Sequence, residues 1–490
     1  MHKELVKHNT TRAIALAATM LAVVSTTTLA QGTASVPAPP PISNAEFAAR
    51  RTALAASLPD GIILALGARE PEADYLSFFQ GTNFRYLTGV KEPNASLVGV
   101  KRGSNVQWTL FVQPKDPSRE VWSGRLVGAD SAEAKWGIKG RASLHLRAYL
   151  DSVLTTGATN LSVIASLGSS EWKSMDDQFI ASITSKHPAV QMRNANANVS
   201  KLRAFKTEAE LALIRRATAI TVDAHAEAAK TVRPHANEYE VDAVVSYTFR
   251  RNGAERSSFA SIVGSGPNAT TLHYNANDRQ MQPGEVVVVD IGASVEGYSA
   301  DMTRTYPVSG TFSAEQRAVY QVVRGAQAAA ERQAKIGARA SIMSDSANAT
   351  LAAGLAKIGL IESPTATYDC SADGTRKCSQ LSLYYMHGLG HGIGLEVHDP
   401  DRYYLEGVFG EGSVFTLEPG IYVRENLLDI LPKTPRNAQL AEKLRPLLQR
   451  YRNVGVRIED DYIVTSKGLE WITRSPRELA EIEALMARRM

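Results

Sequence analysis

Two aspartates in the C-terminal half of this 490-residue sequence, Asp290 and Asp301, stand where paired carboxylates could hold a cation. Asp290 ends a run of four valines, residues 286–289, which is typical of a strand buried on both faces. Asp301 lies in a second strand-like run, residues 298–305, and glycines between the two runs suit a hairpin. Such a hairpin would bring two like charges together, an arrangement that a bound cation stabilises. Either aspartate alone is more often the residue of an Asx turn.

Three of the chain's ten histidines fall within residues 387–398. His387, His391 and His398 are interleaved with glycines, which would disrupt an ordinary helix and let the backbone approach a ligand closely. Imidazole is a common ligand of transition metals. A single histidine here would more often be structural, whereas three among glycines favour a site.

Two glutamates lie near the ends of further strand-like runs. Glu418 follows residues 414–417 and precedes a Pro-Gly pair. Strand alternation puts Arg457 and Glu459 on one face of a run, so that Arg457 could orient carboxylate ligands. Taken alone, Arg457 and Glu459 are better explained as a solvated ion pair on an exposed face.

The elements that must position these residues form two units. In the first, residues 45–200, helical and strand-like patterns alternate, which predicts an α/β domain. It contains an amphipathic helix at 47–58 and strands at 61–66, 96–101 and 107–113.

The second unit, residues 201–490, combines strands with surrounding helices and predicts an α+β fold. A long helix is expected at 207–230, and another from Asn237 to Gly253. Ser313 and Gln316 form a capping box that opens a helix running to about Lys335. Strands are predicted at 259–263, 285–291 and 298–306, and residues 384–465 are strand-like with a helical insert at 438–451.

The N-terminus has the layout of a secretory signal. A basic stretch, residues 1–12, precedes an apolar run, 13–24, and small residues end at Ala30. The run is short for a membrane span. We therefore expect cleavage after Ala30 and export, with an uncleaved anchor as the alternative. Residues 31–44 form a proline-rich linker.

The two cysteines, Cys370 and Cys378, would form a disulfide in an exported protein, although their spacing alone leaves two free thiols open. Net charge is +4, so the sequence gives no reason to expect nucleic acid as a partner.

The candidate residues resemble the metal ligands of the pita-bread metallopeptidases in type and order: Asp290, Asp301, His391, Glu418 and Glu459. The flanking motifs resemble the aminopeptidase P branch of that family: HGLGH at 387–391, EVHD at 396–399, TLEPG at 416–420 and GVRIED at 455–460. In the first unit, residues 83–93 and 121–125 resemble the creatinase-like N-terminal domain of the same branch. Residues 363–380 match no part of the pattern and would reshape the mouth of the site.

The resemblance implies a C-terminal pita-bread catalytic domain preceded by an α/β creatinase-like domain. It also implies a dinuclear metalloaminopeptidase acting on peptides with proline at the second position, through a metal-bridging hydroxide. The expected ions are two Mn²⁺, with Co²⁺ or Zn²⁺ as alternatives. Family members are homo-oligomers, so a dimer or tetramer is expected.

The implied roles divide the site residues between metal binding and catalysis. Asp290 would bind one ion, His391 and Glu418 the other, and Asp301 and Glu459 would bridge. Glu418 would also handle the proton of the attacking water. His398 would stabilise the oxyanion, and His273 would bind the substrate near the leaving group. His387 would line the pocket, and Arg457 would hold Asp290 in place.

Two other functions compete with this one. Prolidase, a dipeptidase on the same metal site, would need an arginine to capture the proline carboxylate, and Arg402 and Arg424 are candidates. A non-catalytic pita-bread binding protein would have replaced ligands, whereas all five ligand positions are intact here.

Overall fold

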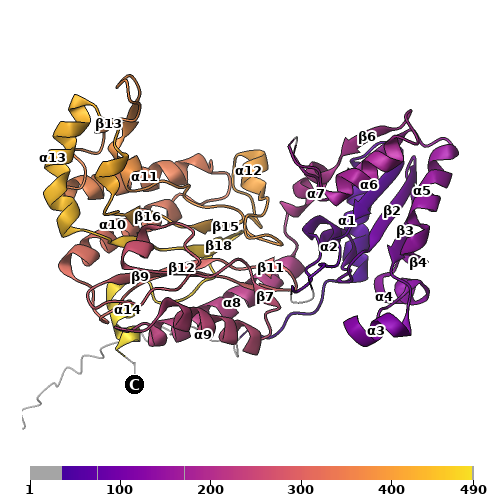
Figure 1. Cartoon of the computed structure of the whole chain (residues 1–490), viewed down its shortest axis with the longest axis horizontal. Helices are drawn as coiled ribbons and strands as arrows, with labels where there is room; N and C mark the ends of the chain where they lie inside the picture. Colours follow the sequence, from indigo (N-terminus) through magenta and orange to yellow (C-terminus); the bar gives the residue numbers. More distant parts are fainter. Residues whose placement is uncertain (1–35, 74–75, 170, 488–490) are drawn as a thin grey trace, which may run out of the picture.

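The computed structural model describes residues 36–73, 76–169 and 171–487, which form two domains side by side (Figure 1). The predicted signal segment, residues 1–30, lies outside the described residues. Among those described, no helix is both long and apolar enough to cross a bilayer.

The N-terminal domain is built on a six-stranded mixed sheet with the order β4-β3-β2-β1-β5-β6. Its central strand β1 (Gly61–Leu66) pairs antiparallel with β2 and parallel with β5. The other strands are β2 (Ser96–Arg102), β3 (Asn105–Val112), β4 (Lys139–Ala142), β5 (Asn160–Ile164) and β6 (Gln191–Asn194). The helices are α1 (Asn44–Ala56), α2 (Thr82–Thr88), α3 (Pro117–Ser123), α4 (Ala132–Trp136), α5 (Leu146–Thr155), α6 (Met175–Thr184) and α7 (Asn196–Arg203).

Alternate residues of β1 enter two different hydrophobic cores, as the period of a strand requires. Ile62 and Leu64 pack with residues of α5 and α6. Ile63 and Ala65 face the opposite way, in a core that also contains residues of the C-terminal domain such as Leu395. This second core therefore crosses the boundary between the two domains.

The C-terminal domain surrounds short antiparallel sheets with helices. Its main sheets have the orders β12-β9-β8 and β15-β18-β19. The strands are β7 (Arg256–Ser257), β8 (Ile262–Ser265), β9 (Val286–Ile291), β10 (Ala293–Val295), β11 (Tyr298–Ser299), β12 (Met302–Pro307), β13 (Thr367–Asp369), β14 (Lys377–Ser379), β15 (Val414–Leu417), β16 (Gly420–Tyr422), β17 (Gly455–Arg457), β18 (Asp460–Thr465) and β19 (Gly468–Trp471). The helices are α8 (Glu208–Thr231), α9 (Glu238–Arg251), α10 (Ala314–Glu331), α11 (Ser341–Lys357), α12 (Arg402–Glu406), α13 (Pro435–Arg450) and α14 (Leu479–Met486).

Most of the predicted elements are confirmed, although the starts predicted for α1, at 47, and for α13, at 438, each lie three residues too late. The capping box of Ser313 and Gln316 opens α10, and Asn237 caps α9. Helix α10 ends at Glu331 rather than near Lys335, because the chain turns there toward Gly337, whose amide donates to the carbonyl of Phe409.

Two predicted strands need correction. The strand expected at 259–263 begins only at Ile262, because Ser258 is held by hydrogen bonds to the carbonyls of Gly292 and Ala293. The strand expected at 298–306 is two strands, β11 and β12, interrupted at 300–301 where the chain passes from one sheet to another. Helix α11 and the hairpin β13–β14 were not predicted.

Candidate metal centre

The hairpin predicted between the two aspartates exists. Strands β9 and β12 pair antiparallel, with Asp290 opposite Thr303. Asp301 lies at the break just before β12, and both carboxylates are buried. A break in the sheet at Asp301 frees its side chain to turn toward the neighbouring cavity, which both aspartates line.

His391 comes from the glycine-rich loop, and the structure revises the role of those glycines. A Cβ atom at Gly390 would lie 2.0 Å from the carbonyl oxygen of Thr416 in β15, and one at Gly392 would lie 2.4 Å from that of Asp399. The glycines therefore allow the loop to pack closely against the backbone of other segments. The sequence had indicated that they allow close approach of a ligand. The amide of His391 also donates to the Thr416 hydroxyl at 3.1 Å.

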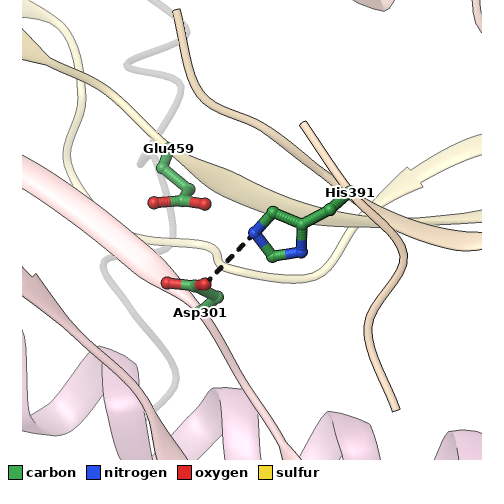
Figure 2. A group of neighbouring side chains, drawn as sticks. All are labelled: Asp301, His391 and Glu459. Carbon is green, nitrogen blue, oxygen red and sulfur yellow. Dashed lines mark ion pairs between the residues drawn. The ribbon is translucent and has the colours of Figure 1, made fainter. Parts of the chain in front are cut away.

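Three predicted metal ligands, Asp301, His391 and Glu459, place potential ligand atoms within 4.8 Å of one another (Figure 2). The Nε2 atom of His391 lies 3.5 Å from Asp301 Oδ2 and 3.5 Å from Glu418 Oε1. Glu418 and Asp290 line the same cavity, whose volume is about 460 Å³. All five predicted ligands therefore converge on one cavity, although they come from five separate segments.

The protonation states of this cluster reflect its burial. Burial raises the pKa of Asp301 well above its usual value, and Glu459 and Asp290 add to the effect. Burial also raises the pKa of Glu418 to about 8, although Arg457 opposes the shift. Burial lowers the pKa of His391 to about 4, so its imidazole is neutral near pH 7 and able to ligate a metal.

Three buried carboxylate oxygens in this cavity have no hydrogen-bond partner within the described part of the chain: Asp290 Oδ1, Asp301 Oδ1 and Glu459 Oε1. An unpartnered buried acceptor is costly, and more so when it is charged. Carboxylate oxygens and an imidazole nitrogen are suitable ligands for divalent transition metals. The donor set thus fits divalent ions, which would satisfy these oxygens.

Arg457 is buried inside this cluster, so its interpretation as half of an exposed ion pair with Glu459 is wrong. Its guanidinium donates to Asp290 Oδ2 at 2.6 Å, as the predicted holding role requires. It also donates to Thr303 Oγ1 at 3.2 Å, and that hydroxyl donates to Glu459 Oε2 at 2.7 Å. Arg457 and Thr303 therefore orient two carboxylates, one from β9 and one from the break between β17 and β18.

Tyr422 connects Arg457 to His387, a link that the sequence did not indicate. The Tyr422 hydroxyl accepts from Arg457 at 3.0 Å, so its own proton is directed to His387 Nε2, 2.8 Å away. His387 Nδ1 then carries the ring proton and donates to the carbonyl of Gly388 at 2.8 Å. Burial lowers the pKa of His387 to about 4, which agrees with a neutral ring. Thr303 and Tyr422 were missed because nothing in their local sequence marks them.

The other predicted catalytic histidines, His273 and His398, also line the cavity. The rings of His398 and His391 lie 4.1 Å apart between centroids. Apolar side chains complete the wall, among them Phe259, Ile262, Leu272 and Val397.

The two arginines considered for carboxylate capture, Arg402 and Arg424, are not among the described residues around the cavity. Arg402 pairs with Glu406 at 2.6 Å, and Arg424 faces the carbonyl of Leu383.

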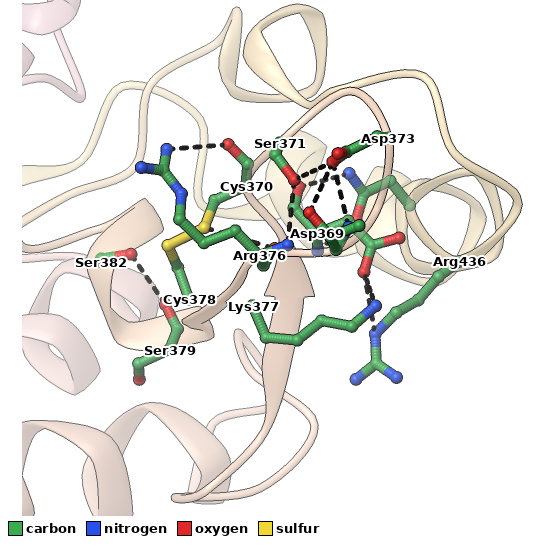
Figure 3. The surroundings of a disulfide bond; sticks show 12 residues. Asp369, Cys370, Ser371, Asp373, Arg376, Lys377, Cys378, Ser379, Ser382 and Arg436 are labelled. Carbon is green, nitrogen blue, oxygen red and sulfur yellow. Dashed lines mark hydrogen bonds and ion pairs between the residues drawn. A yellow bond between two sulfur atoms is a disulfide. The ribbon is translucent and has the colours of Figure 1, made fainter.

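The unmatched stretch at 363–380 forms the hairpin β13–β14, closed by the predicted disulfide between Cys370 and Cys378 (Figure 3). Asp369 ties the hairpin to the start of α13, where it accepts from the Thr434 hydroxyl at 2.6 Å. Residues of this stretch are not among those described around the cavity, so the expectation that it reshapes the mouth of the site is not met.

Comparison with known proteins agrees with this architecture. The profile of metallopeptidase family M24 matches residues 212–466, and that of the aminopeptidase P N-terminal domain matches residues 47–161. Xaa-Pro aminopeptidases of Haemophilus influenzae and Escherichia coli are each 31% identical to the chain, over 90% and 91% of it and 97% and 98% of their own lengths. Human Xaa-Pro dipeptidase is 31% identical over 84% of each chain.

Solved structures agree as well. Pseudomonas aeruginosa aminopeptidase PepP matches with a TM-score of 0.76 at 29% identity, covering 91% of this chain and 98% of that one. Zinc-substituted E. coli aminopeptidase P in complex with product matches with a TM-score of 0.76 at 30% identity, covering 91% and 99%.

The fold and the cavity together define a two-domain metallopeptidase. The chain belongs to metallopeptidase family M24 and carries the aminopeptidase P N-terminal domain. The predicted fold class and the predicted enzyme class, a metalloaminopeptidase, are confirmed.

Proposed function

We propose that this chain is an exported aminopeptidase that uses two divalent metal ions to hydrolyse the bond between an N-terminal residue and a following proline. The observation that carries the proposal is the convergence of five potential ligands on one cavity, with three of their buried oxygens unpartnered. The Xaa-Pro aminopeptidases that align with about nine-tenths of the chain support the choice of substrate.

The five carboxylate and imidazole side chains that line the cavity would hold the two ions: Asp290, Asp301, His391, Glu418 and Glu459. When bound, the two ions supply Lewis acidity, which lowers the pKa of water and polarises the scissile carbonyl. Four carboxylates with one imidazole suit Mn²⁺ better than an ion that prefers thiolates, with Co²⁺ and Zn²⁺ as alternatives.

The remaining polar groups of the cavity act on the peptide and on protons. Glu418 accepts the proton of the attacking water at its carboxylate and returns it to the leaving proline nitrogen. His398 donates a hydrogen bond to the developing oxyanion. His273 binds the substrate near the leaving group, and His387, fixed by Tyr422, forms part of the pocket wall.

Prolidase is the second candidate, because human Xaa-Pro dipeptidase has the same 31% identity to the chain as the aminopeptidases, over 84% of the chain compared with 90%. A dipeptidase gains specificity from a cation that captures the proline carboxylate. The engagement of Arg402 with Glu406, and the position of Arg424 outside the cavity lining, favour the aminopeptidase.

Peptide length separates the two candidates. A tripeptide Xaa-Pro-Yaa should be cut at the Xaa–Pro bond, and its Xaa-Ala-Yaa counterpart far more slowly, at equal metal and protein concentrations. Release of the N-terminal residue is the measurement. Cleavage confined to Xaa-Pro dipeptides would instead establish a prolidase.

Export and assembly complete the proposal. The signal-like layout of residues 1–30 supports export, and the disulfide fits an oxidising compartment. N-terminal sequencing of the exported protein should begin at Gln31, whereas retention of residue 1 would indicate an anchor. A dimer or tetramer is proposed from the family resemblance, and sedimentation equilibrium would test it.

A further inference from the structure

The segment that joins the two domains passes directly behind the loop that carries His391 and His398. Arg203 is the last residue of α7, and Lys206 follows it just before α8 begins. Both side chains are almost wholly buried, with 4% and 1% of their surfaces exposed. Two buried cations so close together require a buried anion.

The buried carboxylate that contacts both cations is Asp399, the residue that follows His398, while Lys206 also lies 4.0 Å from the buried Asp401. Arg203 forms a short ion pair with its Oδ1 atom, and Lys206 Nζ lies 3.2 Å from its Oδ2 atom. Lys206 also donates to the carbonyl of Pro400 at 2.5 Å, and Arg203 reaches Glu396 at 2.9 Å. The two cations thus hold the loop at Glu396, Asp399 and Pro400.

Asp399 in turn determines the shape of the loop. Its Oδ1 atom accepts from the amide of Glu396 at 3.1 Å, and its own amide donates to the carbonyl of Gly392 at 2.8 Å. A Cβ atom at Gly394 would lie 2.5 Å from Asp399 Oδ2, so the carboxylate fills the inside of the loop. The loop contains both His391 and His398, whose rings are in contact.

The same arginine connects the loop to the N-terminal domain. Arg203 donates to Asn83 Oδ1 at 2.8 Å, and Asn83 donates to Asn196 Oδ1 at 3.1 Å. Asn83 belongs to α2 and Asn196 to α7, both in the N-terminal domain. Movement of that domain would therefore reach the histidine loop through Arg203.

We propose that Arg203 and Lys206 are positioning residues, which hold His398 at the oxyanion by neutralising and fixing Asp399. The inference rests on the role given to His398 in the proposed function. Residues that hold a reactive or ligating group in place from behind orient it, and removing one of them typically lowers activity by about 10-fold to 100-fold. On this account the N-terminal domain supplies part of the geometry of a catalytic centre that lies wholly in the other domain.

Arg203→Gln and Lys206→Met are the variants that test the inference, with Lys201→Met, on the exposed side of α7, as the matched control. The first two should lower kcat about 10-fold to 100-fold with little change in KM and unchanged metal content, whereas the control keeps wild-type kcat. Arg203→Lys, which keeps the charge, should recover most of the lost kcat if Arg203→Gln folds poorly. Wild-type kcat in a folded Arg203→Gln protein would overturn the proposal.

The decisive readout combines Arg203→Gln with His398→Ala. If Arg203 acts through His398, the double variant should have the kcat of His398→Ala alone, within about twofold. Multiplied losses would mean that Arg203 acts by another route and would overturn the inference. Wild-type kcat in His398→Ala would overturn both the inference and the proposed role of His398, whereas a loss in His398→Ala with none in Arg203→Gln removes the inference alone.

Discussion

Glu459 and Asp460 are consecutive, equally buried acidic residues, yet their surroundings are opposite in kind. Glu459 faces the cavity, where one of its oxygens has no partner within the described chain and burial, reinforced by Glu418, raises its pKa. Asp460 faces the other way. Burial opposes its charge as well, but Arg304 and Arg477 outweigh that effect and lower its pKa.

The partners of Asp460 show how the protein itself satisfies a buried carboxylate. Arg304 donates to it at 2.7 Å, Arg477 at 3.1 Å, Gln327 at 2.9 Å and Thr473 at 2.6 Å. The carboxylate of Asp460 is thus fully paired, whereas the carboxylates of the cavity are short of positive charge. Three carboxylate oxygens of the cavity lack a hydrogen-bond partner among the described residues, whereas the neighbouring Asp460 has four partners. This difference suits the cavity to binding cations.

The largest expected difference between the two sides is in the stability of the metal-free protein. Asp460→Asn leaves Arg304 and Arg477 partly unpaired, so the free energy of unfolding should fall by about 3–5 kcal/mol. Glu459→Gln replaces a carboxyl group whose charged form is disfavoured by burial and by Glu418, and it keeps the shape of the side chain, so it should leave that free energy unchanged or raise it. Chemical unfolding of both metal-free variants provides the comparison. Equal destabilisation by the two substitutions would show that the two sides do not differ.

The oxyanion role proposed for His398 gives the next largest effect. His398→Ala should lower kcat by about two to three orders of magnitude, equivalent to about 2.7–4 kcal/mol, the range for losing one oxyanion donor. Metal content should survive, because His391 is the proposed ligand. Steady-state kinetics and elemental analysis of one preparation test both points, and loss of metal would mean that the two histidines exchange roles.

The disulfide hairpin belongs to neither side, so it should affect stability without affecting chemistry. Replacing both Cys370 and Cys378 by serine should lower the free energy of unfolding by roughly 2–3 kcal/mol in the chain-entropy model. The kcat of the variant should match the wild type, since the hairpin contacts α13 and its residues are not among those described around the cavity. Thermal unfolding with and without reductant measures the first effect, and a changed kcat would contradict the second.

The smallest predicted effect concerns His225, a buried histidine near Arg304 and Asp460. Burial and the nearby Arg304 lower the pKa of His225 to about 3, so the folded protein keeps it neutral where the unfolded chain, with a pKa near 6.5, takes up a proton. Its contribution is fully present above about pH 6.5 and is lost as pH falls toward 3. Between pH 7.5 and 5.5 the wild type should lose about 1.4 kcal/mol more than His225→Gln. Parallel losses in the two proteins would contradict this.

The sequence predicts the cavity side far better than the side of Asp460. Asp290 and Asp301 were recognisable because strand periodicity and intervening glycines are local signals. Strand alternation separates Glu459 from Asp460 but does not show which of the two is paired, since that depends on partners such as Arg304, distant along the chain. Thr303, Tyr422 and Arg203 were missed for the same reason.

Secondary structure follows a similar rule. Helices α8 and α10, which have side-chain caps, begin where the sequence predicts. Helices α1 and α13 also have side-chain caps, Ser43 and Thr434, yet each begins three residues before its predicted start. Helix α11 has no side-chain cap and distributes its apolar residues around the whole helix, so it gives no periodic signal. The break between β11 and β12 depends on two sheets meeting, which a strand pattern does not encode.

The central claim is that the unsatisfied carboxylates of the cavity bind catalytic metal. The most direct test is elemental analysis of the purified protein, with Xaa-Pro-Yaa hydrolysis measured on the same sample before and after treatment with a strong chelator. We expect two transition-metal ions per chain, loss of hydrolysis on their removal, and the best recovery with Mn²⁺. Full activity in a preparation shown to be free of metal would contradict the account.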